Sequence, residues 1–312
     1  MTIVSRWRTK AARRPSRVVL ADTTDQRAID AAAIVNTEGF AEAVVVDAGP
    51  GLQLSDAVKE RAAGLRQPPD LDDPLSVATL MVACGEADAC IAGASRPTAD
   101  VIRAGLRILG MSSTATTVSS SFFFVLPDHG VLADDPRRHV VYGDCGVLPD
   151  PDATELASVA IDSAKTFAQL TGQTPKVAML SFSTKGSAEH ARVDKVREAT
   201  EIVRDRAPDL EVDGELQFDA AWDLAVGSSK APRSEVAGQA NVFIFPDLSS
   251  GNIAYKITER LTGAQAFGPL LQGLDGIMHD LSRGCSVDDI VNVAAIAAVQ
   301  SASRLEHQTS SS

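Results

Sequence analysis

Short apolar runs alternate with segments of helical periodicity along most of the chain, and this alternation restricts the possible folds more than any other feature. The first cycle comprises an apolar run at residues 17–21, helical spacing of apolar residues over 25–40, and another apolar run at 43–47. A strand, a helix and a second strand in this order form a unit with parallel strands and a helix on one face of the sheet. The sequence therefore predicts an α/β fold with mainly parallel sheets.

The pattern changes near Thr114, which indicates a second domain. The stretches "STATTVSSSFFFVLP" and "HVVYGDCGV" are rich in residues that favour β-strands, and helical periodicity returns over 152–170. A chain of 312 residues also exceeds the usual size of a single domain. We therefore expect two domains.

Composition argues against several classes of function. The net charge of −12 disfavours nucleic acid as a partner, because proteins that bind its phosphate backbone usually carry a basic face. No run approaches the roughly 18 apolar residues of a membrane span, so we expect no membrane partner. The four cysteines form no CxxC pair, and the five histidines form no HxxxH or HExxH motif. We therefore expect reduced thiols in a cytoplasmic protein and no metal site.

The first 17 residues form a basic segment. They contain six Arg or Lys residues and no acidic residue. They also lack the apolar stretch of a secretory signal. We interpret this segment as a frayed basic tail, with a transit peptide as the alternative.

Three places in the sequence share one design, in which a turn of small polar residues follows an apolar strand and precedes a helix. They lie at residues 180–187, 245–252 and 281–286. In open α/β sheets, ligands bind outside the carboxyl ends of the strands, where helix N-termini offer free N–H groups to anions. Together with several arginines, these turns favour an anionic ligand. The absence of GxGxxG and GxxxxGK[ST] motifs argues against a dehydrogenase or an ATPase.

Several long segments carry the pattern of a known family. They include "TADVIRAGLRILG" (98–110), "YGDCGVLPDPDATELA" (142–157), "PKVAMLSFSTKGSAEHARVDKVREA" (175–199), "VAGQANVFIFPDLSSGNIAYKITERL" (236–261) and "DLSRGCSVDDIVNVAAIAAVQ" (280–300). In these segments the chain resembles the phosphate acetyl/butyryltransferase family, most closely its acetyl-transferring members. The resemblance implies an enzyme that reversibly converts acetyl-CoA and phosphate into acetyl phosphate and coenzyme A.

The resemblance also implies the domain organisation and the partners. Two α/β domains are expected, the second inserted into the first, with the active site in the cleft between them. Mapped onto this sequence, the first domain comprises 1–116 plus 276–312, and the second comprises 117–275. The expected partners are coenzyme A, acetyl phosphate, phosphate and a second copy in a homodimer. Coenzyme A acts as a substrate, and no tightly bound cofactor is expected.

The catalytic motif of the family matches this sequence at Ser282, Arg283 and Asp289. The resemblance implies that Asp289 is the base that accepts the proton of the coenzyme A thiol. Arg283 would stabilise the charge that develops on the carbonyl and phosphoryl oxygens. Ser282 would orient the thiol through a hydrogen bond. This route requires neither a metal ion nor an acyl-enzyme.

By the same resemblance, Arg103, Arg260 and Arg61 would bind phosphate or coenzyme A. Gly251 and Asn252 are further substrate-binding candidates, because this pair would let the backbone approach the pantetheine or the phosphate. The match at Arg61 lies in a shortened segment, residues 60–66, in which Arg66 is the second choice. Arginines on helices are by themselves usually solvated or paired at the surface, and turn geometry alone would also select Gly251 and Asn252.

Local chemistry offers other interpretations of the catalytic stretch. Residues 286–289 also fit a helix N-cap, with Ser286 as the cap and an acid three residues later. Cys285 would need a nearby histidine to act as a nucleophile, and we do not favour His279 for that role. Two alternatives to acetyl transfer are open: a propanoyl or butanoyl substrate, and a catalytically weak homologue with a regulatory role.

Overall fold

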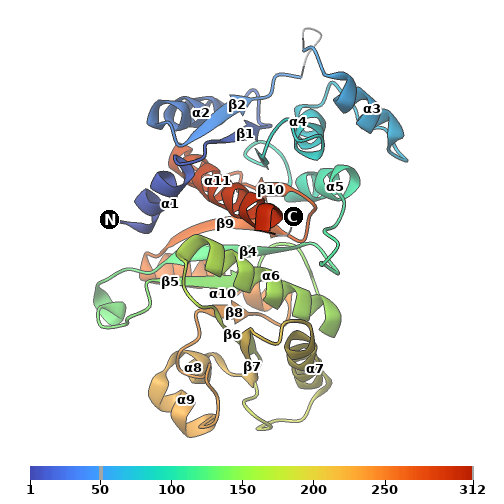
Figure 1. Cartoon of the computed structure of the whole chain (residues 1–312). Helices are drawn as coiled ribbons and strands as arrows, with labels where there is room; N and C mark the ends of the chain where they lie inside the picture. Colours follow the sequence, from blue (N-terminus) through green and yellow to red (C-terminus); the bar gives the residue numbers. More distant parts are fainter. Residues whose placement is uncertain (49–51, 311–312) are drawn as a thin grey trace. The chain divides into compact units, whose positions relative to one another are not determined.

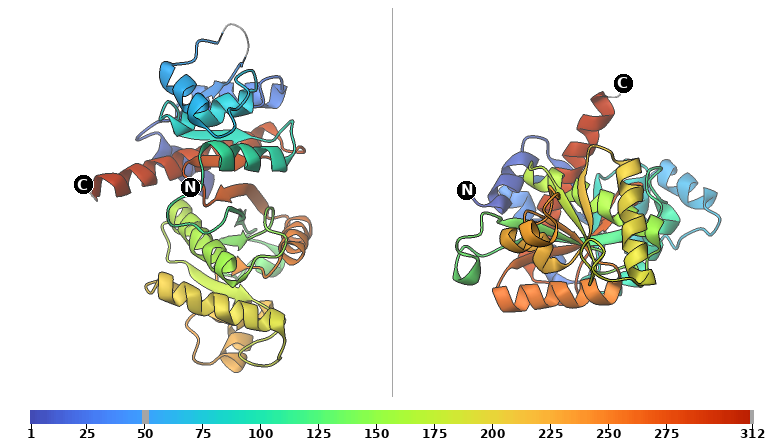
Figure 2. Two further views of the ribbon diagram at one scale, coloured as in Figure 1. Left: turned by 90° about the vertical axis from the view of Figure 1, so that its right-hand side faces the viewer. Right: turned by 90° about the horizontal axis from the view of Figure 1, so that it is seen from below.

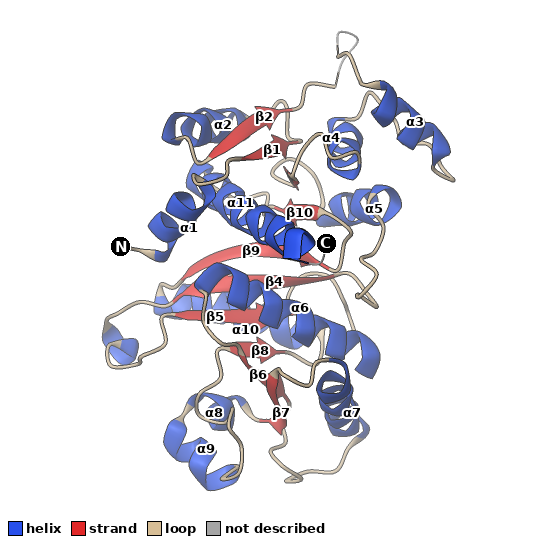
Figure 3. Cartoon of the chain, viewed as in Figure 1, coloured by secondary structure: helices blue, strands red, loops and turns tan. Residues whose placement is uncertain are grey.

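The computed structural model describes residues 1–48 and 52–310, which divide into two compact units (Figure 1). The first unit is built from the described residues of Met1–Ser113 and Leu274–Ser312, and the second from Thr114–Gly273. Helices and strands alternate in both units (Figure 3). The α/β class with mainly parallel sheets, predicted from the sequence, is confirmed.

The first unit contains a four-stranded sheet in the order β10-β3-β1-β2, and all its strand pairs are parallel. The strands are β1 (Ser16–Leu20), β2 (Ala41–Val45), β3 (Ala89–Ala92) and β10 (Ile277–Asp280). Leu20 is in register with Ile91, and Asp280 is in register with Ala92. The segments that follow β1, β3 and β10 therefore begin at the same edge of the sheet, although β10 comes from the distant end of the chain.

The helices described in the first unit are α1 (Ile3–Ala11), α2 (Gln26–Glu38), α3 (Asp56–Gly64), α4 (Pro74–Ala83), α5 (Thr98–Ile108) and α11 (Val287–Ser310). The Ala- and Val-rich α11 packs against α1, α2 and every strand of the sheet. Helix α4 contacts β3, and α5 contacts α4 and β10. Most of the apolar residues of α11 are fully buried, so this helix forms the centre of the hydrophobic core of the first unit.

The interpretation of the first 17 residues as a frayed tail is wrong. Helix α1 begins after Thr2, whose side chain accepts a hydrogen bond from the backbone of Ser5, a regular N-cap. Ile3, Trp7 and Ala11 lie on one face of the helix at intervals of four residues, and Trp7 is only 1% exposed. The high basic charge concealed this apolar spacing. Burial of the Trp7 side chain removes a large apolar surface from water, and this stabilises α1 against the rest of the first unit.

The second unit contains a six-stranded sheet in the order β7-β6-β8-β5-β4-β9. The strands are β4 (Ser119–Val125), β5 (His139–Gly143), β6 (Lys176–Leu180), β7 (Glu211–Leu216), β8 (Val242–Ile244) and β9 (Gln265–Gln272). β4 runs antiparallel to β5 and β9, and the other pairs are parallel. One face carries an aromatic cluster that includes Phe122, Phe124, Tyr142, Phe243 and Phe245. The chain's few aromatic residues are thus concentrated in this core.

The helices of the second unit are α6 (Ala153–Thr171), α7 (Ala191–Arg206), α8 (Phe218–Trp222), α9 (Leu224–Lys230) and α10 (Leu248–Thr262), with a short 3-10 helix η1 (Gly130–Leu132). α6 and α7 lie side by side (Figure 2). α6 begins at a capping box between Asp152 and Glu155 and ends at Gly172, which adopts a left-handed conformation. Within residues 1–48 and 52–310, no helix combines the length and apolar character that crossing a bilayer requires.

Candidate functional site

Hydrogen bonds join the segments that follow β1, β3 and β10 at the carboxyl edge of the sheet in the first unit. Asp22 follows β1, and its carboxylate accepts hydrogen bonds from the backbone nitrogens of Ala94 (3.1 Å) and Ser95 (2.9 Å), which follow β3. The Ser95 hydroxyl also donates to Asp22, at 2.5 Å. Beside them, the Leu281 nitrogen donates to the carbonyl oxygen of Ala92 at 2.8 Å. This edge is therefore rigidly hydrogen-bonded where the chain leaves β10.

The turn after β10 presents two of the proposed catalytic side chains. The nitrogen of Cys285 donates to the carbonyl oxygen of Ser282 at 2.9 Å, and the nitrogen of Gly284 donates to Oγ of Ser282 at 3.2 Å. The side chains of Ser282 and Arg283 are exposed. The turn thus offers a hydroxyl and a guanidinium to a solvent-borne ligand.

Asp289 forms the capping box that the local sequence suggested. Its Oδ2 accepts hydrogen bonds from the backbone nitrogen and from Oγ of Ser286, both at 2.8 Å, and its own nitrogen donates to Ser286 Oγ at 3.1 Å. The Asp289 side chain is half-buried at the start of α11. Among the described residues no hydrogen bond reaches its Oδ1. One oxygen therefore caps the helix, and the other can accept a proton from a ligand.

Two buried carboxyl groups, those of Asp22 and Asp280, lie at this edge, and sequence reasoning missed both. Asp280 at the end of β10 is fully buried, and Thr98 Oγ1 donates to its Oδ2 at 2.5 Å. Burial raises the pKa of Asp280 to about 6, and the negative charge of Asp22 acts in the same direction. A Cβ at position 93 would lie 2.2 Å from Asp280 Oδ1, so Gly93 is required here. The available sequence signal was an acidic residue at or just after the end of an apolar strand.

Cys285 does not have the surroundings of a nucleophile. It is buried, and burial raises the pKa of its thiol to about 11. His279 is buried as well, and burial lowers its pKa to about 4. Its Nε2 lies 2.7 Å from Oε1 of Gln300, so the imidazole is occupied by a structural contact. In the described part of the chain, no three His, Cys, Asp or Glu residues are grouped to hold a metal ion.

Arg61 and Arg103 belong to the first unit, on α3 and α5. Nη2 of Arg61 donates to the carbonyl oxygen of Ile108, at the end of α5, at 3.0 Å. Arg103 is 68% exposed in its side chain and pairs with Asp100 at 2.7 Å, one turn earlier on the same helix. An exposed pair of this kind contributes little stability, so Arg103 can exchange its partner for a ligand at low cost.

Gly251, Asn252 and Arg260 belong to the second unit and lie on α10. A Cβ at position 251 would meet the carbonyl oxygen of Asp144 at 2.2 Å, and Nδ2 of Asn252 donates to the carbonyl oxygen of Cys145 at 3.0 Å. These two residues therefore dock the first turn of α10 onto the turn that follows β5. Arg260, in the last turn of α10, is exposed. A substrate role for these three residues stays a prediction.

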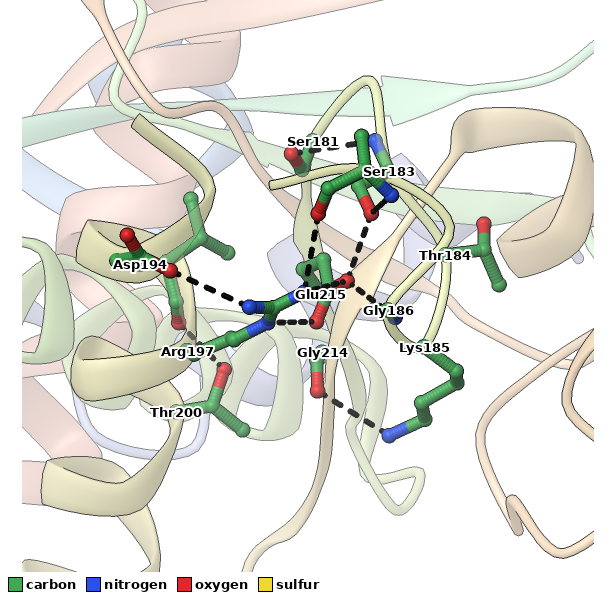
Figure 4. A network of polar contacts seen from close by, with 12 residues as sticks. Ser181, Ser183, Thr184, Lys185, Gly186, Asp194, Arg197, Thr200, Gly214 and Glu215 are labelled. Atoms are coloured by element: carbon green, nitrogen blue, oxygen red, sulfur yellow. Dashed lines mark hydrogen bonds and ion pairs between the residues drawn. The ribbon is translucent and has the colours of Figure 1, made fainter. Parts of the chain in front are cut away.

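The "STKGS" turn after β6 is held by charged partners (Figure 4). Lys185 adopts a left-handed backbone conformation with φ of 47°. Its ammonium group pairs with Asp213 and also donates to the carbonyl oxygen of Gly214 at 3.1 Å. A lysine fixed in this way stabilises its own turn, so it does not serve as a free cation for an anionic ligand.

Glu215 is the centre of the same network. It accepts hydrogen bonds from Ser183 Oγ at 2.8 Å, from the Gly186 nitrogen at 2.8 Å, and from Arg197 Nε and Nη2 at 3.0 and 3.1 Å. Burial alone would raise its pKa, but these donors outweigh burial and lower the pKa of Glu215 to about 2. This turn is therefore an internal structural element of the second unit.

Two adjoining cavities of about 730 and 570 Å³ open beside β7 in the second unit. Their basic residues are in part already neutralised by acidic neighbours. Arg204 lies 2.9 Å from Asp213, and Lys230 lies 2.8 Å from Asp219. The lining carries both signs of charge, so these cavities do not have the character of a phosphate-binding site.

Comparison with known proteins adds independent information. Residues 66–298 match the model of a family described as phosphate acetyl/butaryl transferase, a range that begins just after Arg61. The chain is 48% identical over 231 residues to a phosphate acetyltransferase of Paracoccus denitrificans, covering 74% of this chain and 72% of that protein. It is 41% identical to a phosphate acetyltransferase of Acetivibrio thermocellus, covering 91% and 93%. A phosphotransacetylase structure from Streptococcus pyogenes superimposes with a TM-score of 0.88 at 36% identity, covering 97% of this chain and 100% of that one.

Proposed function

Because the chain belongs to the phosphate acetyl/butyryltransferase family, we propose that it catalyses reversible acetyl transfer between coenzyme A and inorganic phosphate. The observation that carries the residue assignment is the turn after β10. There, Ser282 and Arg283 are exposed, and Asp289 follows in the first turn of α11 with one carboxylate oxygen available. The three side chains supply a hydrogen-bonding hydroxyl, a positive charge and a base.

The proposed reaction proceeds through direct attack in a ternary complex. Oδ1 of Asp289 takes the proton of the coenzyme A thiol, and the thiolate attacks the carbonyl carbon of acetyl phosphate. Arg283 stabilises the oxyanion of the tetrahedral transition state, because its planar fork matches neighbouring oxygens. Collapse forms acetyl-CoA and releases phosphate. Ser282 orients the thiol through a hydrogen bond.

Arg103 and Arg260 are proposed as substrate-binding residues because of the positive charge of their side chains. Arg103 and Arg260 are exposed, and their guanidinium groups suit the phosphate groups of acetyl phosphate and coenzyme A. Arg61 lies outside the range of the family match, and its guanidinium group donates to the carbonyl oxygen of Ile108. We therefore propose that Arg61 supports substrate binding through this contact with the end of α5. Gly251 and Asn252 would let the backbone of α10 approach the pantetheine or the phosphate closely.

We also propose a cytoplasmic homodimer. The four cysteines are all free, as expected of a protein in a reducing compartment. Ile253, Ile257 and Leu261 form a stripe along α10 and are 58%, 51% and 81% exposed, an arrangement that supports contact with a second copy. Light scattering of the purified protein tests this proposal. A dimer that an Ile257→Lys substitution converts into a monomer would support it, and a monomeric wild type would refute it.

The activity is tested with the purified protein, coenzyme A and acetyl phosphate. Formation of the thioester is followed by absorbance, and a parallel reaction contains butanoyl phosphate. We expect faster turnover of acetyl phosphate. Faster turnover of butanoyl phosphate would assign a longer acyl substrate, and an absence of turnover with both would refute the enzyme assignment.

A further inference from the structure

Arg27 binds the acidic N-cap of its own helix through one edge of its guanidinium group. It is the second residue of α2, and Asp25 is the N-cap. Nε of Arg27 lies 3.0 Å from Oδ1 of Asp25, and Nη2 lies 2.7 Å from Oδ2. Hydrogen bonding from Arg27 holds the pKa of the Asp25 carboxyl below its ordinary value. This two-point contact fixes the plane and direction of the guanidinium group.

The remaining donors of Arg27 reach two other segments of the sheet edge. Nη1 donates to the carbonyl oxygens of Arg283 at 2.9 Å and of Cys285 at 2.7 Å. Nη2 donates to the carbonyl oxygen of Ala94 at 2.8 Å. Asp22 accepts a hydrogen bond from the nitrogen of the same residue, Ala94. One side chain thus connects the start of α2, the end of β3 and the turn after β10.

The turn from Ser282 to Cys285 depends on this contact. Among the described residues, the hydrogen bonds within this turn are the two that Ser282 accepts. Ser282 and Arg283 are exposed, and Gly284 has no side chain. The backbone carbonyls of Arg283 and Cys285 are held from outside by Arg27. Arg27 itself is 31% exposed in its side chain, so it also lies within reach of solutes.

We propose that Arg27 is a positioning residue that orients Ser282 and Arg283 relative to Asp289 by fixing the carbonyl groups of the turn. This inference rests on the proposed function of those three residues. A lysine cannot replace Arg27, because a single ammonium group cannot hold the Asp25 carboxylate and three carbonyl oxygens at once. Loss of the contact shifts the reacting groups without removing any of them.

The first test compares Arg27→Lys and Arg27→Ala with the wild type in the acetyl phosphate assay. A displacement of about 1 Å in an active site costs up to about 100-fold in rate, so kcat should fall between about 10- and 100-fold, with KM changed much less. Low millimolar guanidinium should partly restore kcat of Arg27→Ala, and an equal concentration of NaCl should not. Arg138→Lys is the matched control, because Arg138 also donates to backbone carbonyls, at Leu132, Ala133 and Arg137.

The second test is independent of activity. Hydrogen exchange of a peptide spanning 281–290 should be faster in both Arg27 variants than in the wild type, and a peptide spanning 176–180 should be unchanged. An unchanged kcat, or exchange that rises equally in both peptides, would overturn the positioning role. If the wild type shows no turnover, the proposed function fails. Exchange at 281–290 then still decides whether Arg27 holds the turn.

Discussion

Asp289 accepts both hydrogen bonds from Ser286, one from the backbone nitrogen and one from the hydroxyl, through the single carboxylate oxygen Oδ2. The residue proposed as the base is therefore also part of the capping box at the start of α11. The two roles do not compete, because each uses a different oxygen atom. This division allows the roles to be separated by substitution.

Replacing Asp289 with Asn should abolish most of the turnover and leave α11 in place. The amide oxygen can still accept from Ser286, but it cannot take a proton from the thiol. A general base typically contributes 10²- to 10⁴-fold, so kcat should fall by about that factor. The control is Ser286→Ala, which should lower the free energy of unfolding by about 1 kcal/mol and keep activity. Wild-type turnover in Asp289→Asn would refute the base assignment.

Replacing Cys285 with Ala should leave turnover near the wild-type level. The thiol is buried, its pKa is raised to about 11, and His279 is engaged with Gln300. The assay is the same thioester measurement, with Arg283→Gln as a variant expected to lose activity. If Cys285→Ala were as inactive as Arg283→Gln, the direct attack by coenzyme A would have to be replaced by an acyl-enzyme route.

Replacing Gly251 with Ala should destabilise the second unit. The new methyl group would lie 2.2 Å from the backbone oxygen of Asp144, so the helix or the turn must move. Overpacking of this kind costs about 1–3 kcal/mol. Gly64→Ala is the matched control, because its Cβ meets nothing within 4 Å, and it should be neutral or slightly stabilising. Urea unfolding measures both, and equal midpoints for the two variants would contradict the packing role.

Glu215 should make the stability of the second unit depend on pH in the acid range. Its pKa is lowered from 4.5 to about 2 in the folded state, so its stabilisation is complete above about pH 4.5. It is lost as the pH falls towards 2, and the difference corresponds to about 3 kcal/mol at most. Urea unfolding at pH 5 and pH 3 should show a larger loss in the wild type than in Glu215→Gln. An equal loss in both proteins would argue against this carboxylate.

The strand-turn-helix pattern was readable from the sequence because it depends on local spacing. Apolar runs and helical periodicity located β1, α2, β2 and most of the later elements, and "SVDD" indicated the cap of α11. Elements with mixed patterns were missed. β7 places Asp213 and Glu215 inside a strand, and α1 hides Trp7 among basic residues. In both places tertiary contacts outweigh local composition.

The sequence by itself determined the α/β class, the family and the three residues proposed to carry the chemistry, because these depend on patterns within contiguous segments of the chain. Only the tertiary structure decided which distant residues support them. Arg27 and Cys285 are 258 positions apart, and Asp22 and Ser95 are 73 apart. They meet because β10 pairs with β3 and β3 pairs with β1. Strand order is a global property of sheet pairing, and no local pattern encodes it.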